Sequence, residues 1–177
     1  LLRPANYPSD VPGAGSIVMN TSAGEKIAVL NLSGRVFMSA LDCPFQTAKR
    51  ELPALKEQTS VIIVDFHAEA TSEKSAIGWF LDGEVSAIVG THTHVQTADE
   101  KILPKGTAFI TDVGMTGPVD SVIGVEKEQI INKFLTQIPV RFETAKGEAL
   151  LSCVLLDINS RTGIANSIQR LQFSFPG

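Results

Sequence analysis

The sequence predicts a layered α/β domain, and three observations lead to this fold class. Short runs of β-branched residues without polar alternation lie in the middle of the chain, as in strands that are covered on both faces. Helical patterns of apolar residues alternate with these runs. Pairs of apolar segments flank turn residues near both ends. This mixture disfavours an all-helical or an all-β fold.

A hairpin and an amphipathic helix are expected in the first third of the chain. Residues 15–33 contain two short apolar segments around the turn cluster Asn20 to Gly24, which is the turn chemistry of a hairpin. Between residues 44 and 58, apolar residues recur every three or four positions, which predicts a helix that Pro53 can bend. The expected inward residues are Phe45, Ala48, Leu52 and Leu55.

Two buried strands and a second helix are expected next. The apolar runs at 61–66 and 85–90 predict strands that are covered on both faces. Between them, Ser72 is expected to cap a helix that continues to Asp82 and ends at Gly83. The expected inward residues of this helix are Ala76, Ile77, Phe80 and Leu81.

The last part of the chain is expected to add a strand, a helix and a terminal hairpin. Their expected bounds are 107–112 for the strand, Glu126 to Gln137 for the helix, and 149–159 with 163–173 for the hairpin. No internal repeat, low-complexity tract or linker interrupts this pattern. Residues 1–177 are therefore expected to form a single domain.

The composition limits the possible partners of the protein. Its 15 lysine and arginine residues against 19 acidic residues give a net charge of −4, which disfavours a grip on polymeric nucleic acid. No apolar run reaches the ~20 residues of a membrane span, and the start lacks the pattern of a signal peptide. Cys43 and Cys153 lack a paired spacing. We expect a cytoplasmic protein without a membrane partner, and a homo-oligomer is compatible with the sequence.

All three histidines of the chain follow predicted buried strands. His67 comes directly after the earlier strand, and His92 and His94 come after the later one. A lone histidine is more often structural, but ligand sites in open α/β sheets form at the carboxyl ends of strands, where all three would meet. Alternate residues of an extended segment point the same way, so His92 and His94 are expected to face one metal ion or two adjacent ions. Zinc, iron and manganese suit such ligands.

Nearby carboxylates are candidates for holding the imidazole rings in place. The expected acceptors of the outer imidazole N–H groups are Asp65, Glu69, Asp99 and Asp112. An acidic residue beside a loop is more often merely solvated, so each carboxylate by itself is a weak indication.

The stretch from Asp112 to Pro118 is a candidate phosphate-binding loop. Its glycines permit positive φ and close backbone approach, so the N–H groups of Gly114, Met115, Thr116 and Gly117 are expected to receive a phosphate oxygen. Taken alone, such a stretch is more often an ordinary turn. The chain has no motif for a serine or cysteine nucleophile, which leaves metal chemistry as the better hypothesis.

Four strings of residues together resemble one family. They are DFHAEATSEK, GWFLDG, GTHTHVQTADE and ITDVGMTGPVDSVIG. On these strings, and over essentially the whole chain, the sequence resembles the YmdB-like branch of the calcineurin-like metallophosphoesterases. The resemblance implies a four-layer α/β/β/α sandwich with mixed sheets, two metal ions (Fe, Mn or Zn), and a small phosphodiester substrate such as 2',3'-cyclic AMP.

The resemblance also implies roles for individual residues. His67 and His92 resemble ligands of one metal, and His94 resembles a ligand of the other. In the family, the remaining ligands and the histidine that protonates the leaving group come earlier than the position of Leu1, so no catalytic acid is expected in this chain. We therefore expect an N-terminally truncated domain with at most one well-formed metal site and little activity alone, although the intact family uses a metal-activated hydroxide as nucleophile.

Two other functions fit parts of the same pattern. A capsule or polyglutamate biosynthesis-type member of the superfamily also carries a histidine after one strand and an HxH-like string after the next, but the string DVGMTGP favours the phosphodiesterase. A non-catalytic domain with one structural metal is the alternative from another class. Metal content and activity would separate these hypotheses.

Overall fold

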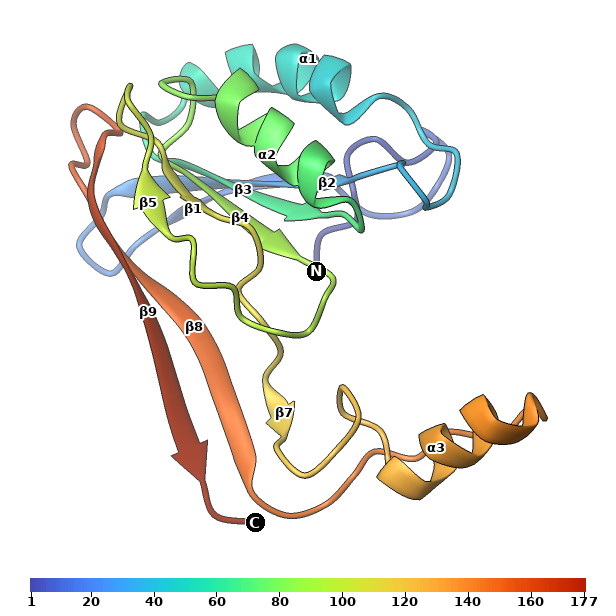
Figure 1. Ribbon diagram of the computed structural model, residues 1–177. Coiled ribbons are helices and arrows are strands. Elements are labelled where there is room, and N and C mark those ends of the chain that lie inside the picture. Colours follow the sequence, from blue (N-terminus) through green and yellow to red (C-terminus); the bar gives the residue numbers. More distant parts are fainter.

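Two β-sheets and two helices make up the body of the molecule, and a third helix stands apart from it (Figure 1). The computed structural model describes residues 1–177. The helices are α1 (Pro44–Lys56), α2 (Thr71–Phe80) and α3 (Lys127–Thr136), and none is long and apolar enough to cross a bilayer. The strands are β1 (Ser16–Asn20), β2 (Lys26–Ser33), β3 (Ile62–His67), β4 (Ala87–Thr91), β5 (Lys101–Ile102), β6 (Ala108–Ile110), β7 (Gly117–Pro118), β8 (Ala149–Ile158) and β9 (Ala165–Phe175).

The larger sheet has a parallel centre. Its strand order is β1-β2-β3-β4-β6-β5, in which β2, β3, β4 and β6 run parallel and the outer strands β1 and β5 pair antiparallel. The carboxyl ends of the four parallel strands therefore meet at one edge of the sheet, where loops from distant parts of the sequence lie side by side. This edge is called the carboxyl edge below.

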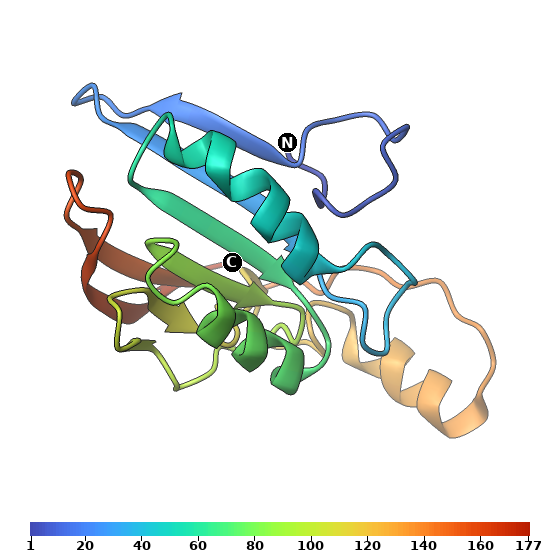
Figure 2. The ribbon, with the colours of Figure 1, turned by 90° about the horizontal axis from the view of Figure 1, so that it is seen from above.

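Helices α1 and α2 cover one face of this sheet (Figure 2). The side chains of strand β3 alternate between the two faces of the sheet. Val64 and Phe66 are fully buried in the core beneath the helices, together with Leu52 of α1 and Ile77 of α2. Its intervening residues, which include His67, point to the opposite face.

The smaller sheet, with the order β7-β8-β9, packs against that opposite face. Small side chains let the two sheets approach closely, since Ala87, Ala108 and Ala165 are buried at the contact. The result is an α/β/β arrangement that matches three of the four expected layers. Helix α3 lies away from both sheets (Figure 1), and exposes Phe134 and Leu135.

The mixed α/β fold class is confirmed, as are both hairpins, but the bounds of α2 differ from the prediction. The helix starts at Thr71, its N-cap residue is Ala70 without a side-chain cap, and Ser72 lies inside the first turn. It ends at Phe80, before Gly83. The two-residue strands β5 and β7 were not expected, because so short a segment carries no readable periodicity.

The inward face of α2 also differs from the prediction. Ile77 and Leu81 are buried as expected, but Ala76 and Phe80 are exposed. The remaining inward positions are taken by the charged residues Glu73 and Lys74, which are 6% and 1% exposed. Apolar periodicity could not identify this face, because the two charges are buried through partners that lie far away in the sequence.

Candidate functional site

His67 and His92 meet at the carboxyl edge of the larger sheet. His67 is the last residue of β3, and His92 follows Thr91, the last residue of the neighbouring strand β4. Nδ1 of His92 lies 3.2 Å from Nε2 of His67. The two rings meet edge to face, with centroids 4.9 Å apart. Adjacent parallel strands thus bring together two imidazoles that are 25 residues apart in the sequence.

The outer nitrogen of each ring contacts a side-chain oxygen. Nε2 of His92 contacts the carboxylate of Glu69, and Nδ1 of His67 lies 3.1 Å from the Thr91 hydroxyl. A carboxylate only accepts hydrogen bonds, so Nε2 of His92 donates to Glu69. The Thr91 hydroxyl can donate to Nδ1 of His67 or accept from it, according to the tautomer of the ring. The two inner nitrogens therefore face each other at hydrogen-bond distance, and the tautomer of each ring sets which of them carries a proton.

This pair of imidazoles fits two ligands of one metal ion. Imidazole nitrogens bind zinc at about 2.0 to 2.1 Å, so two of them at right to tetrahedral angles lie about 2.8 to 3.4 Å apart. The observed 3.2 Å falls in this range. The chain does not complete a metal-binding group of three or more His, Cys, Asp or Glu side chains. His67 and His92 could therefore contribute two of an ion's ligands.

The contacts of His94 are not shared with the His67–His92 pair, so its expected role as a ligand of a second ion stays a prediction. Its Nδ1 lies 3.3 Å from the carbonyl oxygen of Ile123, and its side chain lines a separate cavity of about 320 Å³ with Met115. The expectation assumed an extended segment, but β4 ends at Thr91, and φ is +128° at His92 and +65° at His94. The alternation of an extended strand does not apply to this bent loop.

Burial and charge shift the pKa values of two groups on this face. Burial is the largest effect on His67 and lowers the pKa of its imidazole, and the nearby His92 acts in the same direction. Burial raises the pKa of Asp65, although its 2.6 Å hydrogen bond from Asn31 opposes that shift. His67 therefore stays neutral, as a metal ligand must, to a lower pH than an exposed histidine.

Asp112 binds the backbone of two loops instead of an imidazole. Its Oδ2 accepts the N–H of Thr93 at 2.8 Å and the ammonium of Lys74 at 2.9 Å, and its Oδ1 accepts the N–H of Gly114 at 3.0 Å. Burial raises the pKa of Asp112, but these hydrogen bonds together outweigh burial and the net pKa is lowered. Of the four expected carboxylates, only Glu69 contacts an imidazole, and Asp99 hydrogen-bonds Thr111.

The glycine-containing loop lies beside His94, but its backbone is largely occupied. Gly114 has φ of +82°, as the glycine suggested. Its N–H donates to Asp112, and the N–H of Met115 donates to the carbonyl of His94 at 3.2 Å. These two N–H groups therefore have acceptors within the protein, and the expected role of Gly114 and Met115 in phosphate binding stays a prediction. Thr116 is exposed and makes no hydrogen bond within the protein, so its donors remain available.

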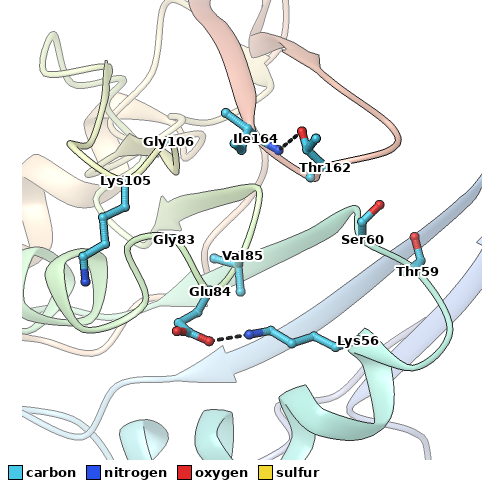
Figure 3. A pocket seen from close by; sticks show the side chains of 11 residues that line it. Lys56, Thr59, Ser60, Gly83, Glu84, Val85, Lys105, Gly106, Thr162 and Ile164 are labelled. Atoms are coloured by element: carbon cyan, nitrogen blue, oxygen red, sulfur yellow. Dashed lines mark hydrogen bonds and ion pairs between the residues drawn. The ribbon is translucent and has the colours of Figure 1, made fainter.

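A second polar cavity, of about 310 Å³, lies at the opposite edge of the sheet (Figure 3). Ser60, Val85 and Gly106 line it, and each precedes a parallel strand. Its carboxylate, Glu84, pairs with Lys56 across the cavity (Figure 3). It contains no imidazole, and it is separated from the histidines by the length of the strands.

Sequence reasoning missed two residues that shape the carboxyl edge, Thr91 and Lys74. Lys74 lies three residues before Ile77 and seven before Leu81, so helical spacing placed it on the buried face. That spacing was the available signal, but a lysine is rarely fully buried. Thr91 offered no comparable signal, because its contact with His67 depends on strand pairing.

Comparison with known proteins places this chain in a family. The family model described as YmdB-like protein matches residues 1–171. A 2',3'-cyclic-nucleotide 2'-phosphodiesterase of Bacillus subtilis is 53% identical over 171 residues, which are 97% of this chain. The chain spans 64% of the length of that relative.

Two crystal structures share the fold. A hypothetical protein from Thermus thermophilus has a TM-score of 0.92 and 42% sequence identity, and the match covers 99% of this chain and 68% of that one. A novel phosphatase from Mycoplasma pneumoniae has a TM-score of 0.87 and 39% identity, with 98% and 63% covered.

Proposed function

The chain belongs to the YmdB-like family, and from this premise we propose that it serves a metal-dependent phosphodiesterase acting on small cyclic nucleotides of the 2',3'-cyclic AMP type. The name of the Bacillus subtilis relative supports the substrate class. The observation that carries the metal dependence is the 3.2 Å separation of the inner nitrogens of His67 and His92. At this separation, two neutral imidazoles can bind one divalent ion.

Each residue of the proposed site has a distinct task. His67 and His92 bind the ion, while Thr91 and Glu69 keep the outer protons in place so that the inner lone pairs stay available. We assign His94, on the bent loop beyond β4, to a second ion. A bound divalent ion supplies a water of lowered pKa and polarises the phosphoryl group.

Substrate binding is assigned to the loop beside His94. Thr116 is exposed on this loop and has a free hydroxyl and N–H, which suit a phosphate oxygen. Gly117 joins the small sheet through Leu150 and fixes the end of the loop. We infer that the substrate is a small phosphodiester in the cytoplasm, because a net charge of −4 does not suit a nucleic-acid polymer.

Metal binding and hydrolysis test this proposal separately. Zinc and manganese titrations of the chain should show binding that His67→Ala and His92→Ala each weaken at least tenfold. The protein, loaded with manganese, should hydrolyse 2',3'-cyclic AMP, and both variants should lose that activity. Lys105→Ala, in the cavity at the opposite edge, is the matched control and should change neither result.

Three outcomes would contradict the proposal. Metal affinity that is the same in the wild type and in His92→Ala would remove the imidazole pair as a metal site. Binding of metal without hydrolysis of any phosphodiester by the protein would indicate a structural metal. Hydrolysis that persists after chelation of all metal would exclude the metal-dependent mechanism.

A further inference from the structure

Lys74 is the most deeply buried charged residue of α2. Its side chain is 1% exposed, and its ammonium lies 2.9 Å from Oδ2 of Asp112, which is also 1% exposed. A lysine is almost never fully buried unless it is paired, because the charge loses its hydration. Apolar residues would fill the same space without that cost, so the ion pair calls for an explanation beyond packing.

The partner of Lys74 joins three separate parts of the carboxyl edge. Asp112 follows β6 by two residues, and its carboxylate receives Lys74 from α2, the N–H of Thr93 from the loop beyond β4, and the N–H of Gly114 from its own loop. Thr93 is the residue between the two histidines of the HxH string. One ionised carboxylate therefore holds the backbone that carries His92 and His94.

That backbone is strained and needs an anchor. His92 and His94 both have positive φ, at +128° and +65°, which L-residues with a β-carbon rarely adopt. Such conformations persist only where the surrounding structure holds them. The Thr93 N–H bond to Asp112 is the anchor between the two strained residues, and the charge of Lys74 keeps its acceptor in place.

We propose that Lys74 is a positioning residue, whose buried ion pair with Asp112 sets the directions of the His92 and His94 imidazoles. The expected effect of the ion pair on metal binding rests on the proposed function. Its expected effect on the geometry of the loop is independent of that function, because the contacts involved lie within the chain. Lys74 itself touches neither a metal nor a substrate in this scheme.

The test replaces Lys74 by Met, which has a similar length and no charge. Imidazole ¹⁵N NMR of the metal-free chain should show changed His92 and His94 signals in Lys74→Met. Zinc affinity should fall by about tenfold to a hundredfold, as when groups that orient metal ligands are removed. Asp112→Asn keeps a side-chain oxygen for only one of the two backbone N–H groups and loses the charge, so it should move the same signals by at least as much. If Lys74→Met does not fold, Asp112→Asn decides whether the ion pair sets the directions of the imidazoles.

The matched control is Asp82→Asn. Asp82 is also buried, at 5% exposed, and its carboxylate accepts the N–H of Lys105 in a loop at the opposite edge. This variant should lower the melting temperature without moving the His92 and His94 signals. Unchanged imidazole signals in the folded Lys74→Met or Asp112→Asn chain would overturn the proposal and leave the pair a purely stabilising role. If the wild type binds no zinc, the proposed function fails while the NMR arm still decides the role of Lys74.

Discussion

Nδ1 of His92 and Nε2 of His67 face each other at 3.2 Å, while the outer nitrogen of each ring contacts a side-chain oxygen. A shared proton or a bound cation stabilises two ring nitrogens at this separation. In the proposed site a metal ion takes the place of that proton.

The first prediction concerns Glu69, which contacts the outer nitrogen of His92. Glu69→Ala should weaken zinc binding by about tenfold to a hundredfold, because the His92 ring loses the acceptor that fixes its proton and orientation. Thermal stability should change little, since the Glu69 and His92 side chains are 50% and 30% exposed. Calorimetric titration measures the affinity. Glu84→Ala, which removes an exposed carboxylate at the other edge, is the control, and equal affinities in both variants would count against the contact.

Metal binding should weaken as the pH falls. Protons compete with the metal for the imidazole lone pairs, so zinc affinity should be about tenfold to a hundredfold lower at pH 5.5 than at pH 7.5. The lowered pKa of His67, caused first by burial, keeps that ring neutral below its ordinary value of about 6.5. The part of the loss in zinc affinity that is due to protonation of His67 should therefore appear at a lower pH than it would for an exposed histidine. Equal affinity at the two pH values would indicate carboxylate ligands instead.

Asp112 should contribute stability that acid removes. Its folded pKa is lowered, because its hydrogen bonds outweigh the opposing effect of burial. Its contribution is thus fully present above the unfolded value of about 3.9 and is lost as the pH falls through the lower folded pKa. Asp112→Asn should cost about 3 kcal/mol at pH 7, because Lys74 is left buried without a charged partner.

Urea unfolding at pH 7 and pH 2.5 measures this dependence. The difference in unfolding free energy between the wild type and Asp112→Asn should shrink at the lower pH. Asp157→Asn, at an exposed position of β8, should cost little at either pH. A difference that stays constant between the two pH values would show that ionisation of Asp112 does not stabilise the fold.

Gly114 should be more sensitive to a β-carbon than its φ alone explains. A β-carbon there would lie 2.8 Å from the backbone nitrogen of Gln96, and φ is +82°. Gly24 has nearly the same φ, +84°, but open space around it. Both Gly→Ala changes cost about 1 kcal/mol or more of backbone strain, and Gly114→Ala should cost at least 1 kcal/mol beyond Gly24→Ala. Equal melting temperatures for the two variants would contradict the close approach to Gln96.

The sequence by itself determined the order of the elements and the edge at which the chemistry lies. Buried strands without polar alternation predicted a sheet covered on both faces, and helical crossovers between them make neighbouring strands parallel. Parallel strands share a carboxyl edge, so histidines that follow two of them must meet there. His67 and His92 could be placed together by this reasoning, because it uses only strand order and direction.

Only the tertiary structure decided where individual side chains point. Periodicity reports which positions are apolar, so it could not recognise a helix face on which Glu73 and Lys74 are buried. Nor could it show that the loop beyond β4 bends at His92 and His94, because the bend is held by Asp112, which is 19 residues from Thr93 in the sequence. The direction of an imidazole in a loop depends on hydrogen bonds from distant segments, and those partners come together only when the sheet has formed.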